Sequence, residues 1–268
     1  MYICDDKKEI YFTDVVGALE RSEIKKGDTI FVHVNLGAFG RLGLIRDRSE
    51  LANLFIDAFI KSVGSQGTVI TPTYTYSFCN NEIYDPQNSP SKVGLFSEEF
   101  RMRKDSHRSI NPLFSVSAIG AKAEKLTSNL SKTSFGEESI FHRLQNIKDA
   151  KYVVAGVNYF ICSHVHYIER LMNVPYRYVK KFKGEIQVNG KSYQDEYEYY
   201  VRYLNKNVIP TFDKLEKHLL NKKLINRINL GWNYISTTKF DSVYSEGVNM
   251  LKKDSLFFLK SKPQIDFN

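Results

Sequence analysis

Two residues in the middle of the chain have the types and the spacing of a general acid–base pair. His166 and Glu169 lie three residues apart in the segment 162–169 (CSHVHYIE). On a helix they would share a face, and the carboxylate would fix the imidazole tautomer and raise its basicity. The same spacing also fits an incidental pair on a surface helix. On a strand, Cys162, His164 and His166 would share a face instead and could bind zinc, although no second ligand pair is evident.

A second candidate site is the glycine-containing segment 35–43 (NLGAFGRLG), which lies between a predicted strand and a predicted helix. Three glycines recur at every third position: Gly37, Gly40 and Gly43. They would let the backbone approach a ligand and turn its N–H groups toward phosphate oxygens, and Arg41 and Arg46 add positive charge. The segment is neither a P-loop nor a GxGxxG motif, so a tight turn without a ligand fits it as well.

An alternation of strand and helix patterns over the first 175 residues must position these groups. Residues 29–34 (TIFVHV) and 68–73 (TVITPT) are rich in β-branched side chains and are predicted to be buried strands. Asp47, with Glu50 three residues later, predicts the start of a helix between them. His33 then ends the first strand, where α/β proteins place ligand sites, although a histidine of the core is an alternative.

Residues 163–172 carry the His–Glu pair and are predicted to form a helix that ends before Pro175. Beyond it, Asn189-Gly190 separates two aromatic and charged segments, which predicts a β-hairpin. Helices are expected near 212–221 and 240–253. The sequence therefore predicts an α/β fold in one composite domain, residues 1–268. A central mixed sheet flanked by helices would occupy 1–177, and an antiparallel C-terminal appendage with helices would occupy 178–268.

The overall charge is the unusual feature of the composition. Lys and Arg number 38 against 30 Asp and Glu, which gives a net charge of +8 and a pI near 9.1. Such a protein attracts anions. The basic residues are scattered and no nucleic-acid motif is evident, so no nucleic-acid partner is expected. No apolar run is long enough to insert into a membrane. The three cysteines are widely spaced, which favours a reducing cytoplasm and no structural metal.

Six segments between residues 27 and 177 resemble, in order, motifs of the aminoglycoside 3-N-acetyltransferase family. They are 27–33 (GDTIFVH), 36–40 (LGAFG), 67–75 (GTVITPTYT), 85–94 (DPQNSPSKVG), 108–118 (RSINPLFSVSA) and 166–177 (HYIERLMNVPYR). Each motif is short, and their shared order and spacing make the resemblance specific. The C-terminal third matches only loosely.

The resemblance implies an acetyltransferase that uses acetyl-coenzyme A, needs no metal and does not have the GNAT fold. His166 would be the general base for direct attack by the acceptor amine, and Glu169 would orient it. The residues expected to bind the coenzyme are His33, Asn35, Leu36, Gly37, Ala38, Phe39, Gly40, Arg41, Thr73 and Ser115. Those expected to bind the acceptor are Tyr74, Asp85 and Tyr176.

The residues expected around the acceptor depart from the family pattern. Val34-Asn35, Asn111 and Phe114 replace serines and histidines that are common in the family, and they fall where acceptor and coenzyme meet. The net charge favours an anionic acceptor, such as a nucleotide-linked amino sugar for surface polysaccharide, over a polycationic aminoglycoside antibiotic. Antibiotic resistance is the alternative within this class. A non-catalytic nucleotide- or nucleic-acid-binding module is the alternative from another class. A homodimer is expected, with the aromatic hairpin as a possible interface.

Overall fold

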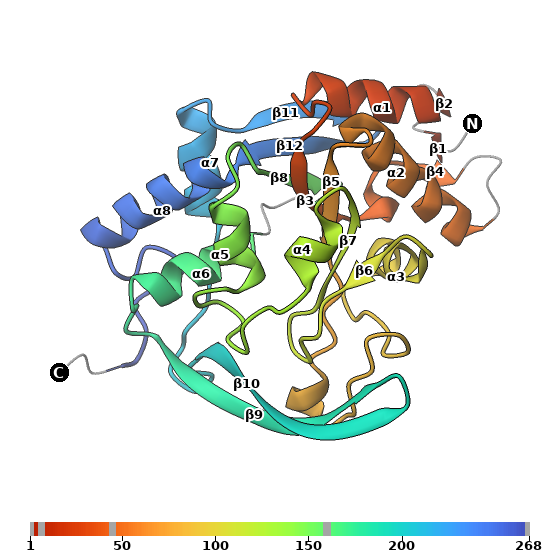
Figure 1. Ribbon diagram of the computed structural model, residues 1–268. Helices are drawn as coiled ribbons and strands as arrows, with labels where there is room; N and C mark the ends of the chain where they lie inside the picture. The colour runs from red at the N-terminus through yellow and green to blue at the C-terminus, as the bar shows by residue number, and fades with distance from the viewer. Residues whose placement is uncertain (1–2, 5–8, 43–46, 158–161, 266–268) are drawn as a thin grey trace.

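The computed structural model describes residues 3–4, 9–42, 47–157 and 162–265. Their central element is a mixed seven-stranded sheet in the order β11-β12-β8-β3-β5-β7-β6 (Figure 1). The strands are β3 (Thr29–Val34), β5 (Thr68–Pro72), β6 (His107–Arg108), β7 (Val116–Gly120), β8 (Lys151–Ala155), β11 (Asn226–Leu230) and β12 (Asn233–Lys239). β3 runs parallel to both of its neighbours, β5 and β8, and the outer pairings are antiparallel.

Helices cover both faces of the sheet. One face carries α1 (Phe12–Arg21), α2 (Arg48–Val63) and α3 (Leu95–Met102). The other carries α4 (Ala123–Thr127), α5 (Ile140–Gln145), α6 (His164–Leu171), α7 (Asp213–Asn221) and α8 (Phe240–Lys253). Alternate residues of β3 point to opposite faces, so Ile30 and Val32 join the first core and Phe31 joins the second. This burial on both faces explains why β3 is a nearly continuous apolar run.

The helix predicted between the first two central strands is confirmed. Asp47 is the N-cap of α2, and its carboxylate accepts a hydrogen bond of 2.9 Å from the backbone N–H of Ser49. The helix ends at Gly64, whose φ of +68° lies in the left-handed region that favours glycine. A short sheet of β1 (Ile3–Cys4), β2 (Glu9–Ile10) and β4 (Arg41–Leu42) precedes α2.

The predicted hairpin is also confirmed. β9 (Arg177–Val188) and β10 (Lys191–Arg202) pair antiparallel across Asn189 and Gly190, which both have positive φ as a type I′ turn requires. The hairpin forms its own two-stranded sheet and curves below the central layer (Figure 1). Its inward side chains, including Ile186, Tyr197 and Tyr200, are buried in the core that contains α6.

The last third of the chain does more than add an appendage, because β11 and β12 extend the central sheet. Residues 235–239 pair with β8, and Ile235 lies opposite Ala155. The predicted α/β class, with a mixed sheet, flanking helices and a separate antiparallel hairpin, is confirmed. Three strands of that sheet, β6, β11 and β12, were not predicted, and the extent of the domain over residues 1–268 stays a prediction. Among the described helices, none has both the length and the apolar character needed to cross a membrane.

Candidate active site

His166 and Glu169 form a hydrogen-bonded pair on α6. The helix places them on one face, and the His166 Nδ1 lies 2.6 Å from the Glu169 Oε2. The Glu169 side chain is fully buried, whereas the His166 side chain keeps 20% of its surface exposed. The imidazole can therefore meet a ligand, and the carboxylate can act only through its protein partners.

Two residues that follow α6 complete the environment of Glu169. The Tyr176 hydroxyl donates a hydrogen bond of 2.9 Å to Oε1, and the Arg177 Nε lies 2.8 Å from Oε2 in a buried ion pair. Burial alone would raise the pKa of the Glu169 carboxyl. The charge of Arg177 and the hydrogen bonds from His166 and Tyr176 outweigh burial and leave that pKa below its ordinary value. Glu169 is therefore an ionised, fixed acceptor.

The imidazole of His166 has the protonation state that a general base needs. Burial and the charge of Arg177 lower its pKa below the ordinary value, against the opposing effect of Glu169. The ring is thus neutral at neutral pH. A neutral imidazole that donates its Nδ1 proton to Glu169 has its lone pair on Nε2. This arrangement allows general-base catalysis.

An aromatic cluster lies beside His166. The Phe135 ring centroid is 5.2 Å from that of His166, and the Phe114 ring is 4.7 Å from both Phe135 and Tyr199 of β10. Tyr74, a predicted acceptor-binding residue, packs 4.9 Å from Phe114. Its hydroxyl is buried. The hairpin thus contributes directly to the surroundings of the histidine.

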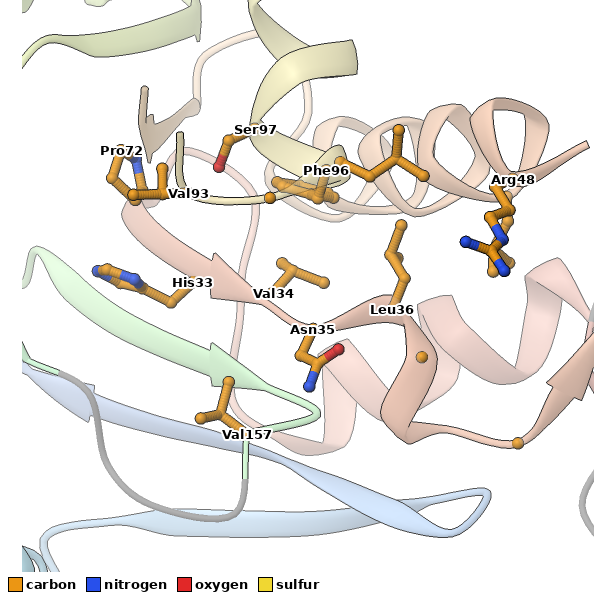
Figure 2. A pocket seen from close by; sticks show the side chains of 15 residues that line it. His33, Val34, Asn35, Leu36, Arg48, Pro72, Val93, Phe96, Ser97 and Val157 are labelled. Atoms are coloured by element: carbon orange, nitrogen blue, oxygen red, sulfur yellow. The ribbon is translucent and has the colours of Figure 1, made fainter. Parts of the chain in front are cut away.

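A cavity of about 720 Å³ lies at the C-terminal end of β3 (Figure 2). Five of the predicted coenzyme-binding residues line it: His33, Asn35, Leu36, Gly37 and Gly40. Its opposite wall comes from Arg48 of α2 and from residues 93–97 at the start of α3. The turn that follows β3 is the short 3₁₀ helix η1 (Leu36–Ala38), held by a 2.9 Å hydrogen bond from Asn35 N–H to the Ala155 carbonyl.

His33 contributes an unpaired polar atom to the cavity lining. Its Nε2 is buried and has no hydrogen-bond partner among the described residues. Burial lowers the pKa of His33 to about 3, so the ring is neutral. In Figure 2 this ring lies at one end of the cavity beside Pro72 and Val93, and Arg48 lies toward the other end. A neutral, unpaired imidazole and an arginine suit a ligand with amide and phosphate groups.

Packing contacts link the His33 end of the cavity to α6, the helix that carries His166. The His33 ring centroid is 5.4 Å from that of Tyr152, and the Tyr152 hydroxyl accepts a 3.2 Å hydrogen bond from the backbone N–H of Ser163. Ser163 directly precedes α6. The two groups of predicted residues thus belong to neighbouring parts of one region, at the C-terminal ends of β3 and β8.

The other predicted residues lie outside the cavity lining. Phe39 is fully buried and packs against Phe55. Thr73 and Ser115 join neighbouring segments, because Thr73 N–H donates to the Ser115 carbonyl at 2.8 Å. Asp85 accepts a 2.8 Å hydrogen bond from the N–H of Gln87 within its own loop.

Ala38 lies at the end of η1, half-buried, and Arg41 follows the turn, with its guanidinium 6.0 Å from the centre of the Trp232 ring. Tyr176 contacts Glu169, as described above. The roles predicted for these residues in binding coenzyme or acceptor stay predictions.

Sequence reasoning gave no role to Arg177 and Arg48. Arg177 ends the VPYR segment, and its position beside Tyr176 was the available signal. Arg48 is the first residue of α2, and nothing in its sequence neighbourhood relates it to β3. Both depend on how separate elements pack.

The zinc alternative required a strand, and residues 164–171 are helical. His164 is fully buried, with its ring centroid 4.7 Å from that of Phe240. Among the described residues, no group of three or more His, Cys, Asp or Glu side chains is arranged to hold a metal ion.

The class that this fold and site define is an acetyl-group transferase. A model of the aminoglycoside 3-N-acetyltransferase family matches residues 31–252, and the chain belongs to that family. It is an acyltransferase whose co-substrate is acetyl-coenzyme A. The expected family is therefore confirmed. No curated protein sequence matches the chain significantly.

Several solved structures share the fold. AAC-IIIb in a binary complex with CoASH is 21% identical, with a TM-score of 0.78 over 95% of this chain and 99% of that chain. AAC-VIa bound to sisomicin is 18% identical, with a TM-score of 0.79 over 92% and 98%. The YokD protein from Bacillus subtilis is 18% identical, with a TM-score of 0.78 over 92% and 95%. At these identities the likeness shows the fold, which is not that of GNAT enzymes.

Proposed function

We propose that this protein transfers an acetyl group from acetyl-coenzyme A to an amino group of an aminoglycoside, with His166 as the general base. The observation that carries the proposal is the buried, ionised Glu169 that holds the Nδ1 of a partly exposed, neutral His166. Family membership supports the reaction, and the sisomicin-bound relative AAC-VIa supports the kind of acceptor. The aminoglycoside acceptor, kept as the alternative in the sequence analysis, is thus better supported than the nucleotide-linked sugar.

The residues of this chain account for the movement of the proton. His166 takes at Nε2 the proton that the acceptor amine loses as its nitrogen becomes an amide nitrogen. Glu169 stabilises the imidazolium that results, and Tyr176 and Arg177 keep the carboxylate in place. Acetyl-coenzyme A would supply the acetyl group when it is bound: its thioester C–S bond would break as the C–N bond forms, and the coenzyme would leave as the thiol with the proton that His166 had taken.

The cavity beside β3 is suited to hold the coenzyme. Its lining combines the unpaired Nε2 of His33, the exposed turn at Asn35 and Gly37, and the cation of Arg48. The backbone N–H groups of the turn and the guanidinium suit a diphosphate, and the imidazole suits an amide of the pantetheine arm.

A nucleotide-linked amino sugar is the second candidate acceptor, because of the charges near the site. The charged groups that act on Tyr199 include Arg177 and Arg202, and the carboxylate of Glu169 already has three partners. Lys180 also acts on the nearby Cys79, whereas Lys92 is paired with Glu82 at 2.7 Å. A basic setting of this kind favours an anionic acceptor.

An assay of thiol release from acetyl-coenzyme A distinguishes the two acceptors. We expect kcat/KM to be higher with kanamycin-type aminoglycosides than with nucleoside diphosphate amino sugars. The opposite order would support the second candidate. Binding of the coenzyme with no turnover of either acceptor class would contradict the proposed function and favour a non-catalytic binding module.

Variants of the pair test the assigned roles. We expect His166→Ala to reduce kcat by roughly 10²- to 10⁴-fold, the range of general-base catalysis, and to leave coenzyme binding intact. Glu169→Gln should lose less activity. It should also shift the acidic limb of the pH profile of kcat/KM to lower pH, because the carboxylate raises the pKa of His166. His107→Ala, at an exposed position on β6, is the control and should retain activity. Full turnover by His166→Ala would remove His166 from the mechanism.

A further inference from the structure

Arg108 is a partly buried cation whose hydrogen bonds go mainly to backbone carbonyls. Its two terminal nitrogens each donate to two acceptors. Nη1 donates to the carbonyls of Pro86 and Ser89, at 3.1 and 2.6 Å. Nη2 donates to the carbonyl of Thr73 at 2.7 Å and to the hydroxyl of Ser115 at 3.3 Å. None of these acceptors is a carboxylate, so the guanidinium fixes the path of the chain and does not neutralise a charge.

Three of the four acceptors belong to the loop of residues 73–94, which joins β5 to α3. Both ends of this loop reach the cavity beside β3, because Pro72 and Val93 line it (Figure 2). The N–H of Lys92 donates a 2.9 Å hydrogen bond to the carbonyl of Tyr74 and closes the loop at this point. The guanidinium therefore ties the start of the loop, which directly follows the cavity wall, to its middle.

The strand that carries Arg108 gives this hold a fixed origin. β6 pairs with β7 of the central sheet, and Arg108 lies opposite Ser117. The N–H of Ser109 donates a 2.9 Å hydrogen bond to the carbonyl of Val116, and the N–H of Val116 donates one of 2.9 Å to the Ser109 hydroxyl. The described lining of the cavity does not include Arg108. Arg108 can thus affect a ligand there through the loop and not by contact.

Other contacts hold the loop at points where the guanidinium does not reach. Tyr84 pairs with β9 through its N–H, 2.9 Å from the Glu185 carbonyl, and through its carbonyl, 2.8 Å from the Gln187 N–H. The N–H of Ser91 donates a 2.7 Å hydrogen bond to the Glu98 carboxylate of α3. Loss of the guanidinium should therefore leave the loop attached at these points and release its start beside the cavity.

We infer that Arg108 is a positioning residue of the acetyl transfer. It holds the loop of residues 73–94, and with it the cavity wall at Pro72 and Val93, in the conformation that takes coenzyme A. The inference rests on the proposed function, in which this cavity takes acetyl-coenzyme A. Arg108 acts on binding through the wall, whereas His166 acts on the chemical step from α6, so the two residues predict different kinetic defects.

The first test separates KM from kcat. We expect Arg108→Ala to raise KM for acetyl-coenzyme A and to lower kcat/KM by about 10²-fold, with kcat at saturating coenzyme close to that of the wild type. Arg108→Lys should recover little of this loss, because an ammonium is a point charge without the fork of donors that the acceptors need. Arg103→Ala removes an arginine that pairs with Asp57 at the end of α3, and this control should keep the wild-type KM.

Chemical rescue by guanidinium distinguishes positioning from a general loss of stability. Arg108 lines a second cavity, of about 360 Å³, together with the exposed residues Ser128, Asn129 and Lys132. From this side a free guanidinium ion can enter the space that Arg108→Ala leaves. We expect millimolar guanidinium chloride to restore part of kcat/KM saturably in this variant, and an equal concentration of sodium chloride to restore none. The wild type and Arg103→Ala should show no gain.

The outcomes separate this inference from the proposed function. If the wild type binds and turns over acetyl-coenzyme A, and Arg108→Ala keeps its KM, the inference is wrong and the function stands. A lower melting temperature of Arg108→Ala, with a loss of activity that guanidinium does not reverse, would also overturn it. If calorimetry detects no coenzyme A binding to the wild type, the proposed function fails and the inference with it. Circular dichroism checks each fold. If the alanine variant does not fold, Arg108→Lys carries the test, and a wild-type KM in it would contradict the inference.

Discussion

His164 and His166 lie two positions apart on α6 and have opposite surroundings. His166 has a carboxylate partner and a partly exposed ring. His164 is fully buried, and neither of its ring nitrogens has a hydrogen-bond partner among the described residues. Burial lowers the pKa of His164 to about 3. One face of a helix therefore carries a candidate base, and another carries a histidine that burial keeps neutral.

This contrast predicts an acid-sensitive fold. The folded pKa of His164 lies below the unfolded value, so between these pKa values the unfolded chain binds more protons. The free energy of unfolding should therefore fall as pH decreases from the ordinary histidine pKa toward 3, by about 1.4 kcal/mol per pH unit for each such histidine. His164→Leu should make this decrease shallower and should not destabilise the protein at neutral pH, because two unpaired nitrogens leave the core.

Urea denaturation at a series of pH values measures this effect. His107→Leu, at an exposed position, is the control and should keep the wild-type slope. His33, whose pKa burial also lowers to about 3, should maintain part of the decrease in the His164→Leu variant. An unchanged slope in His164→Leu would show that protonation of His164 is not linked to unfolding.

At the scale of the elements, two glycine turns have similar backbones and different surroundings. Gly231 joins β11 to β12, and Gly190 joins β9 to β10, with φ values of +57° and +74°. A Cβ at Gly231 would collide with the Phe39 carbonyl, whereas at Gly190 it would meet no atom within 4 Å. The first turn packs against Phe39 and Ile10, and the second projects into open space.

We therefore expect Gly231→Ala to cost more stability than Gly190→Ala. The strain of a positive φ alone costs about 1–2 kcal/mol, and it applies to both variants. The collision with the Phe39 carbonyl adds to this cost in Gly231→Ala alone. Chemical denaturation of the two variants measures the difference. Equal stability of both variants would show that the β11–β12 turn can move away from Phe39 freely.

Local sequence patterns predicted some of the helices and strands and missed others. The predicted helix over 240–253 matches α8 (Phe240–Lys253), and the Asn-Gly signal located the hairpin turn. β11 and β12 were not predicted, although residues 235–238 (ISTT) are mostly β-branched. Their polar residues resemble an exposed segment. They form strands because the edge of β8 is available for pairing, and that edge exists only in the folded sheet.

At the scale of the whole molecule, the net charge of +8 has a defined consequence for binding. Arg48 lines the cavity where the proposed site holds the phosphates, and Arg41 directly follows Gly40 of the same lining in the sequence. We expect the dissociation constant of coenzyme A to rise with ionic strength, because salt screens exposed charges over about 10 Å at 0.1 M. Pantetheine, which lacks the phosphates, should show little salt dependence. Calorimetry at low and high salt measures both, and an equal salt response would contradict phosphate recognition by these arginines.

The sequence by itself determined the local parts of this protein. It placed His166 and Glu169 on one helical face, capped α2 with Asp47, and carried the ordered motifs that indicated the family. Helical spacing, capping and turn geometry depend on neighbouring residues, so they can be predicted from a short segment.

Only the tertiary structure brought Arg177 and Tyr176 onto Glu169, Arg48 to the cavity, and Trp232 beside Arg41. These contacts join separate elements. Their positions follow from which apolar faces are buried and which strand edges pair, and a single segment does not contain that information.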